Sequence, residues 1–443
     1  MKPIWLKRKT LWLITSLLVV LMLMLTTYHV KKQALSLPTV WTDISTKWIG
    51  QDEAPAGTSS SNVTLYAAKG ETEGFQVVVR ASLGGLTNVN FLVTDLLGTN
   101  GQVIPKSNFL LYREHYVYIR QSSPDWWPGG TNRPLPPGWY PDALIPFVDP
   151  ATGLPPVGGI LKAVPFNLTE NKNQPIFADI CVPRTAEPGQ YTGKFTVTSD
   201  QGNVEGQIVL NVWNFELPLK PTLKSCFNVK NRDSDGSVPR GLVLELLRHK
   251  VMPESTGTIT ERELIDKKGL NAKDLGFWSM ADTNNPYLKP APSVDTLKAA
   301  AAAHEPDLYL YNNTADEIGG HPELYDAIKE WGRNLHAAGV DNFITMPVTP
   351  DLFDDGSGTG RSAVDVWSML PKQHYGREAY VSQALNKGDK IWSYNALVQD
   401  GYSPKWNITY DPLNYRIQPG FINASLGYSG INYWGADRWT DDP

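Results

Sequence analysis

Residues 307–346 read DLYLYNNTADEIGGHPELYDAIKEWGRNLHAAGVDNFITM and decide the fold of the C-terminal half. The stretch begins with a strand-like run, DLYLYN, and ends with another, FITM. Between them, Pro322 suits the first turn of a helix and Gly339 suits its end. Four large apolar residues recur there at helical spacing: Leu324, Ile328, Trp331 and Leu335. A strand, a helix and a second strand in succession predict a βα unit of a parallel sheet.

The same alternation extends on both sides of this stretch. Helical patterns cover residues 239–250 and 293–304, the second with Ser293 as a good N-cap. Further strand-like runs cover residues 223–229, 364–370, 390–397 and 429–435. Residues 219–443 are therefore predicted to form a (β/α)8-type barrel, with the strand count open between residues 251 and 292. Because a closed barrel normally finishes with a helix, we expect this one to be incomplete at its C-terminus.

Residues 36–218 have the pattern of an all-β domain. Seven β-rich runs are separated by turn residues: 63–68, 74–81, 89–96, 108–119, 175–182, 191–199 and 206–217. Many of them alternate apolar and polar residues, which predicts an antiparallel β-sandwich. Pro218 and Pro221 mark the boundary with the barrel.

One long loop, residues 121–160, interrupts the sandwich pattern. It is rich in Pro and Gly and carries four aromatic residues: Trp126, Trp127, Trp139 and Tyr140. A loop of this length without secondary structure is usually functional or disordered, and the aromatic residues argue against disorder. Two interpretations stay open: the loop packs against the barrel, or it forms the rim of a binding cleft.

The N-terminal residues, 1–35, have the features of a signal peptide or a membrane anchor. Four basic residues precede an uncharged run, Thr10 to Val30: Lys2, Lys7, Arg8 and Lys9. This run of 21 residues could span a bilayer, and no A-x-A cleavage site follows it. We expect the rest of the chain to be extracytoplasmic, either secreted or anchored, with membrane contact only through this segment.

Composition excludes several functions. The net charge of -5 gives no electrostatic reason to bind nucleic acid. Two cysteines, Cys181 and Cys226, rule out a disulfide-rich scaffold and a Cys-based zinc site, and their apolar surroundings favour buried free thiols over one disulfide. Without a P-loop or an H-E-x-x-H motif, we expect neither a cofactor nor a metal site. The 15 Trp and 19 Tyr residues suit either carbohydrate binding or core packing.

Asp316 and Glu317 are the candidates for catalysis. They follow the strand DLYLYN, and active sites of such barrels lie at the carboxyl ends of the strands. Neighbouring carboxylates do not ionise together easily, and a protonated carboxyl beside an ionised one suits glycosidic bond cleavage. The alternative is that the pair only caps and solvates the next helix. Aromatic and polar residues at other strand ends would line a sugar cleft or plug the barrel mouth.

These residues lie in runs that resemble the catalytic domain of glycoside hydrolase family 123. The runs are LYLYNNTADE (308–317), VDVW (364–367), KGDKIWSYNAL (387–397) and GINYWGADRW (430–439). GETEGFQVVVRA (70–81) and GWYPDALIP (138–146) resemble the sandwich that accompanies it, so the resemblance covers most of residues 50–443. The chain departs from the family pattern in having Ile318, not Pro, after the carboxylates and in ending soon after the YW strand.

The resemblance implies a retaining, substrate-assisted β-N-acetylgalactosaminidase acting on an oligo- or polysaccharide glycan. Glu317 would be the general acid/base, and Asp316 would orient the 2-acetamido group, whose carbonyl oxygen attacks the anomeric carbon. Five residues would line the sugar site: Tyr394, Trp434, Asn395, Trp367 and Arg416. Two alternatives stay open: a non-catalytic carbohydrate-binding or cell-surface protein on a degenerate barrel, and a glycosidase for another sugar.

Overall fold

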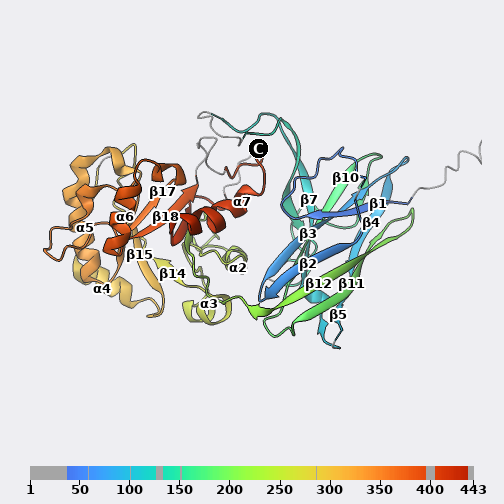
Figure 1. The fold of residues 1–443 in the computed structure, drawn as a ribbon, viewed down its shortest axis with the longest axis horizontal. Helices are drawn as coiled ribbons and strands as arrows, with labels where there is room; N and C mark the ends of the chain where they lie inside the picture. The colour runs from blue at the N-terminus through green and yellow to red at the C-terminus, as the bar shows by residue number, and fades with distance from the viewer. Residues whose placement is uncertain are drawn as a thin grey trace, which may run out of the picture.

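The chain forms two parts, a two-sheet sandwich and a parallel barrel (Figure 1). The computed structural model describes residues 37–57, 59–99, 101–125, 133–149, 152–285, 287–395 and 405–437. The predicted signal or anchor segment lies outside these residues, as do Trp126 and Trp127. No helix in the described ranges has both the length and the apolar character that a membrane crossing requires.

The sandwich consists of a five-stranded and a seven-stranded sheet. The first has the order β1 (Thr39–Ile44), β3 (Thr72–Arg80), β10 (Asn173–Cys181), β7 (Phe109–Ile119) and β8 (Gly138–Pro146). The second has the order β2 (Val63–Lys69), β12 (Val204–Glu216), β11 (Gly189–Thr198), β4 (Leu86–Val93) and β9 (Phe166–Leu168), with β5 (Leu96–Gly98) and β6 (Val103–Ile104) beside β11. All pairs are antiparallel except β2–β12, which is parallel, so the expectation of a wholly antiparallel sandwich is wrong at this pair.

Strand β3 shows how the sequence builds the sandwich core. Its apolar residues are buried on both faces of the sheet, and β1 and β10 flank it on its two edges. Phe75, Val77 and Val79 pack into the core between the two sheets. On the other face, Val78 packs against Trp41, so one strand serves two apolar layers.

The loop predicted at residues 121–160 is only partly a loop. Its middle forms β8, which pairs with β7 and carries Trp139 and Tyr140, so the prediction of no secondary structure is wrong there. Strand β7 is long enough to hold β8 along most of its length. Where described, the remaining loop packs against the barrel: Ser123 N–H donates to Thr409 Oγ1 at 2.9 Å, and the buried Lys405 pairs with Asp125 at 3.1 Å.

The barrel contains seven parallel strands within the described residues. Around the sheet, they follow the order β13 (Lys224–Phe227), β19 (Gly430–Tyr433), β18 (Lys390–Asn395), β17 (Val366–Met369), β16 (Asp341–Thr345), β15 (Tyr309–Asp316) and β14 (Ala272–Asp274). Pairing of the first strand with the last nearly closes the sheet. In the gap between β13 and β14, Phe227 forms an isolated parallel bridge with Pro253. Seven strands and one bridge therefore stand where eight strands were predicted.

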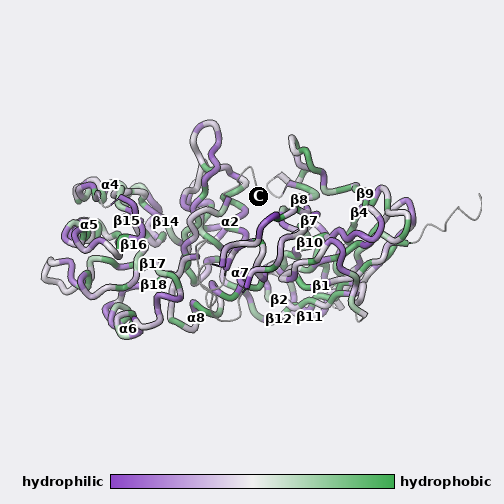
Figure 2. Tube along the Cα trace, turned by 90° about the horizontal axis from the view of Figure 1, so that it is seen from above, coloured by the Kyte–Doolittle hydropathy of each residue, from purple (hydrophilic) through white to green (hydrophobic). Residues whose placement is uncertain are grey.

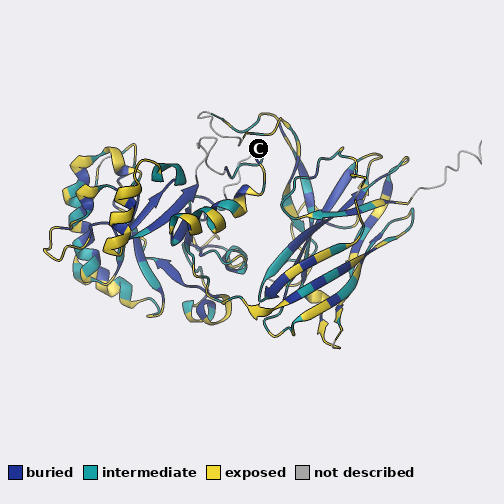
Figure 3. Cartoon of the chain, viewed as in Figure 1, coloured by how far each residue is buried: buried dark blue, intermediate teal, exposed yellow. Residues whose placement is uncertain are grey.

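Helices cover the outside of the barrel, as Figure 2 shows for α4, α5 and α6 beside strands β15–β18. The helices are α2 (Arg240–Arg248), α3 (Glu261–Lys268), α4 (Val294–Ala302), α5 (Tyr325–Ala337), α6 (Glu378–Lys387), α7 (Asn414–Arg416) and α8 (Asn423–Leu426), with a π-helical segment, η6 (Ile417–Ile422), between the last two. The strands are largely buried, and the outer helical faces are exposed (Figure 3). As predicted, Ser293 caps α4 and Trp331 lies on the buried stripe of α5.

Three large aromatic side chains fill the middle of the barrel. The ring of Trp392 on β18 lies 5.2 Å from Tyr311 on β15 and 5.3 Å from Phe343 on β16, measured between centroids. Two other strands separate β15 from β18 in the sheet, so Tyr311 and Trp392 meet across the interior. The barrel is therefore a packed core with no open pore. Cys226 is buried and Cys181 partly buried, and both are free thiols, as predicted.

We predict that Gly430→Ala destabilises the barrel. A Cβ at this position would overlap the indole of Trp392, which is fully buried and has no room to move away. Overpacking of this kind costs about 1–3 kcal/mol in the free energy of unfolding, to be measured by denaturant titration. Gly420→Ala is the matched control, because its Cβ would meet no atom within 4 Å. Equal stability of the two variants would contradict the packing described for Trp392.

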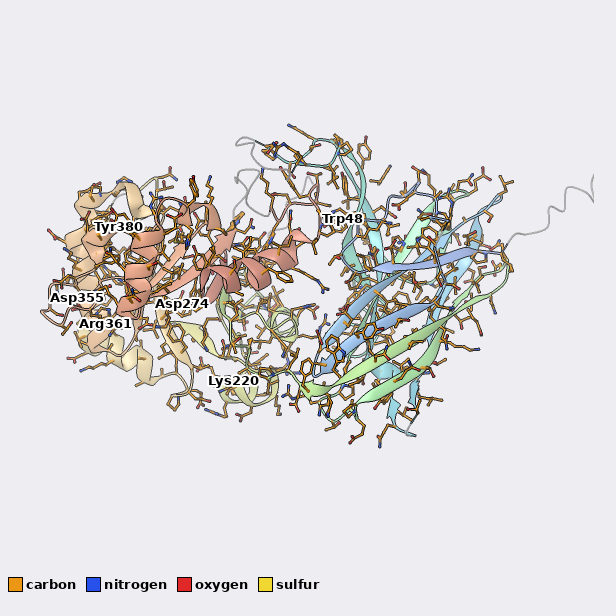
Figure 4. All side chains as sticks on the ribbon, in the orientation of Figure 1. Trp48, Lys220, Asp274, Asp355, Arg361 and Tyr380 are labelled. Carbon is orange, nitrogen blue, oxygen red and sulfur yellow. The ribbon has the colours of Figure 1, made fainter. Side chains whose placement is uncertain are left out.

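The two parts of the chain touch through several side chains. The indole N–H of Trp48 (labelled in Figure 4) donates to the carbonyl of Tyr410 at 2.8 Å. Arg248 of α2 donates to the Tyr112 hydroxyl at 3.0 Å. These bonds join the sandwich to the barrel.

Candidate active site

A cleft of about 1340 Å³ opens at the carboxyl ends of the barrel strands. The segments that follow β15, β16, β17 and β19 supply most of its wall, and this is the end of a parallel barrel where loops from different strands converge. The lining includes acidic, aromatic and amide side chains: Asp316, Glu317, Tyr325, Asp351, Gln373, Tyr380, Tyr394, Asn432 and Trp434.

A bulge in β15 turns Asp316 toward the cleft. Asn313 pairs with Phe343 of β16, but the next pairs are Ala315 with Ile344 and Asp316 with Thr345, so one extra residue lies in β15. Paired residues in a sheet point to the same side. Because Phe343 points into the barrel, Asn313 and, after the bulge, Asp316 also point inward. Bulges commonly redirect a side chain near an active site.

Glu317 lies just beyond the strand in a left-handed conformation, with φ of 53°. This region is unfavourable for a residue with a Cβ, at a cost of about 1–3 kcal/mol, and is found most often at functional sites. The surrounding contacts hold the conformation: the Glu317 N–H donates to the Thr345 carbonyl at 2.6 Å. The Tyr394 hydroxyl donates to Glu317 Oε1 at 2.7 Å. The side chain is thereby fixed against β18.

Burial and neighbouring charges give Asp316 a raised pKa. Burial is the largest cause, and the negative charges of Glu317 and Asp282 act in the same direction. A hydrogen bond from the Thr345 side chain lowers the pKa but does not compensate. The pKa of the Tyr394 hydroxyl is also raised, by burial and by the Glu317 charge. The hydroxyl therefore keeps its proton and donates a hydrogen bond to Glu317. Asp316 therefore keeps its proton to a higher pH than an ordinary aspartate.

Four of the residues predicted from the sequence meet at this cleft. Asp316 and Glu317 line it together with Tyr394 from β18 and Trp434, which follows β19. Neither carboxylate forms a salt bridge within the described part of the chain. Both acids thus share an aromatic-walled cavity.

The other three predicted sugar contacts lie elsewhere. Trp367 is fully buried on the outer side of β17, where its N–H donates to Asp389 at 3.1 Å. Asn395 is buried against Gln418 of η6, at 2.6 Å. Arg416 is exposed and donates to Ser45 Oγ of the sandwich at 3.2 Å. The prediction that these three residues line the sugar site is therefore wrong, because none of them lines the cleft.

The structure adds residues that sequence reasoning missed. Thr345 and Asn432 line the cleft from the ends of β16 and β19. Tyr325 and Tyr380 (the latter labelled in Figure 4) line it from segments after β15 and β17. Asn432 lay inside a run already recognised, but only its register with β18 shows that it points inward. In the described residues, no cluster of His, Cys, Asp or Glu side chains could hold a metal ion.

The sandwich matches a known family model. Residues 41–199 match the model described as the glycoside hydrolase 123 N-terminal domain. The resemblance of the chain to family 123, predicted from its sequence, is thereby confirmed. No curated protein matches the chain.

Comparison with solved structures supports the same relationship for the fold. The chain is similar to a family 123 glycoside hydrolase from Clostridium perfringens, solved in a study of glycolipid glycan hydrolysis, with a TM-score of 0.62 and 13% identity over 92% of this chain and 80% of that one. A GH10 xylanase from termite gut with a bacterial Ig-like domain matches with a TM-score of 0.29 and 13% identity over 59% of this chain and 83% of that chain. That score is too low to support an argument. The family match therefore covers the sandwich, and the structural likeness shows a shared fold over most of the chain.

Proposed function

We propose that the chain is a retaining glycoside hydrolase that cleaves a β-linked N-acetylhexosamine, resembling N-acetylgalactosamine, with help from the substrate's own 2-acetamido group. The observation that carries this proposal is the pair Asp316 and Glu317 in one aromatic-walled cleft, where the bulge in β15 turns Asp316 inward. Adjacent carboxylates suit substrate assistance, because two-carboxylate glycosidases need their groups on opposite sides of the bond.

Each acid has a distinct role in this mechanism. Glu317 donates a proton to the leaving oxygen and later accepts one from water. Its Oε1 receives the Tyr394 hydroxyl, so Oε2 is the oxygen that carries the transferred proton. Asp316, when ionised, accepts a hydrogen bond from the acetamido N–H and raises the nucleophilicity of the carbonyl oxygen. Trp434 offers an indole face for the apolar side of the sugar ring.

The departure at Ile318 is compatible with this role. Ile318 is fully buried and packs with Ala315 and Ile344 in the apolar layer between strands and helices. At the position where the family pattern has Pro, the Ile318 side chain therefore lies in the core and does not line the cleft. The substitution gives no support to the alternative of a non-catalytic barrel.

We further assign the Pro253 segment to the second of eight strand positions, which makes residues 219–443 a (β/α)8-type domain after the sandwich domain at 36–218. We also propose an extracytoplasmic location, because basic residues precede the apolar run at the N-terminus. The glycan would then be an oligosaccharide, polysaccharide or glycolipid glycan outside the cytoplasm.

Substrate assistance is tested by removing the acetamido group. We expect hydrolysis of 4-nitrophenyl N-acetyl-β-galactosaminide, with the β-anomer as the first product in NMR spectra. The matching β-galactoside has a hydroxyl in place of the acetamido group and lacks the internal nucleophile. Its kcat/KM should be at least about a thousandfold lower, because a tethered nucleophile replaces a bimolecular attack. Similar rates for the two substrates, or an α-anomer product, would contradict the proposed mechanism.

A further inference from the structure

Directly below the cleft, the barrel interior contains a layer of polar side chains. Asn432 on β19 pairs in register with Tyr394 on β18, and Gly430 pairs with Trp392 one layer further down. Because paired residues point to the same side of a sheet, Asn432 points inward, as Trp392 does. It lies between the aromatic core and the two carboxylates, at the height of the Tyr394 ring.

Asn432 is buried but incompletely satisfied. Its side chain is 7% exposed, and its Oδ1 has no hydrogen-bond partner among the described residues. Most buried polar atoms in proteins have a partner, and leaving one without a partner lowers the stability of the fold. An acceptor without a partner among the described residues, at the wall of a cleft, favours a partner supplied by a bound ligand.

Two other inward side chains allow a comparison within the same barrel. Asn313 on β15 and Ser368 on β17 also carry a buried oxygen without a partner. Ser368 pairs in register with Trp392 and therefore also points inward. Of the three, only Asn432 lines the cleft. Asn313 and Ser368 can be reached by buried water alone, whereas Asn432 can also be reached by a ligand.

We propose that Asn432 is a specificity-determining residue whose amide oxygen, Oδ1, accepts a hydrogen bond from a hydroxyl group of the bound sugar. The proposal rests on the proposed function, because it places the sugar between Trp434 and Glu317. The hydroxyl is one of those at C3, C4 or C6, since C2 carries the acetamido group. A site built to bind a hydroxyl rejects an analogue that lacks it, because the buried acceptor is then left unpaired.

The first test compares Asn432→Leu with Ser368→Ala. With 4-nitrophenyl N-acetyl-β-galactosaminide, Asn432→Leu should lower kcat/KM by about 10- to 100-fold, mainly through a higher KM. Its thermal midpoint should not fall, because the variant removes an unsatisfied buried atom. Ser368→Ala removes a similar atom away from the cleft and should keep kcat/KM within about twofold. An unchanged kcat/KM for Asn432→Leu would overturn the proposal.

The second test identifies the hydroxyl and starts from the wild-type enzyme. Wild-type enzyme is assayed with the 3-deoxy, 4-deoxy and 6-deoxy forms of the same substrate. One of the three should lose about 10- to 100-fold in kcat/KM, and Asn432→Leu should be insensitive to that one change. Equal kcat/KM for all three and for the parent would overturn the role of Asn432. If wild type hydrolyses no N-acetyl-β-hexosaminide, the proposed function itself fails, and calorimetry with N-acetylgalactosamine then tests Asn432 as a binding group.

Discussion

Glu317→Gln should lower kcat for 4-nitrophenyl N-acetyl-β-galactosaminide by about 10²- to 10⁴-fold, the usual range for loss of a general acid. Gln has the size of Glu and keeps an oxygen that can accept the Tyr394 hydroxyl, so the side chain should stay in place. It cannot donate a proton of the required acidity to the leaving oxygen. Steady-state kinetics and the thermal midpoint of the variant check the two halves of this expectation.

The leaving group gives the loss a specific signature. A 2,4-dinitrophenyl group departs without protonation, so Glu317→Gln should impair its release far less than that of a sugar. Glu323→Gln is the matched control, because Glu323 is exposed, pairs with His321 and lies six residues further on. An equal loss for both leaving groups would assign Glu317 a structural role and remove it from proton transfer.

The sequence predicts the meeting of Asp316, Glu317, Tyr394 and Trp434 because of one property of parallel barrels. All strands end at the same face, so residues at or just after the ends of β15, β18 and β19 converge even though they are far apart along the chain. Neither contact energies nor pair distances are needed for this step. Only the assignment of strands and their direction is required.

The same reasoning cannot decide which side of a strand a residue faces. Strand β17 is buried on both faces, so its sequence, VWSM, shows no alternation of apolar and polar residues. Trp367, which was predicted to line the sugar site, faces the outer helices, whereas Trp392 on the neighbouring strand faces the interior. Asn395 follows Tyr394 and therefore points away from the cleft. A shift of one residue exchanges the two faces, and register is a property of the neighbouring strands.

Two further features depend on contacts distant in sequence. The bulge in β15 that turns Asp316 inward arises from pairing with β16, and nothing in NNTADE shows it. Arg416 binds Ser45 of the sandwich, which lies 371 residues earlier in the chain. Local pattern therefore identified the candidate catalytic pair, but only tertiary pairing explains how the pair is oriented.

Replacing Asp316 by Asn should lower kcat/KM for N-acetyl-β-hexosaminides by about 10²- to 10³-fold, the scale for loss of one group that stabilises transition-state charge. In the proposed mechanism, Asp316 must be ionised to accept the acetamido N–H. Its pKa is raised by burial and by Glu317, so activity should fall on acidification at a higher pH than for an ordinary aspartate. Asp316→Asn should abolish this acid limb of the pH profile. Asp326→Asn, at an exposed site of α5, should leave both rate and profile unchanged.

Thr345→Val tests the electrostatic origin of that limb without removing the carboxylate. The Thr345 side chain donates to the ionised form of Asp316 and lowers its pKa. Without the hydroxyl, the pKa should rise further, and the acid limb of kcat/KM should move to higher pH while the rate on its plateau stays near that of wild type. A shift of the acid limb to lower pH would mean that the Thr345 hydroxyl favours the protonated form of Asp316, and would contradict this account. Burial opposes the ionisation of Asp316 and the Thr345 hydroxyl favours it. The balance of these two effects sets the pH range in which Asp316 is ionised.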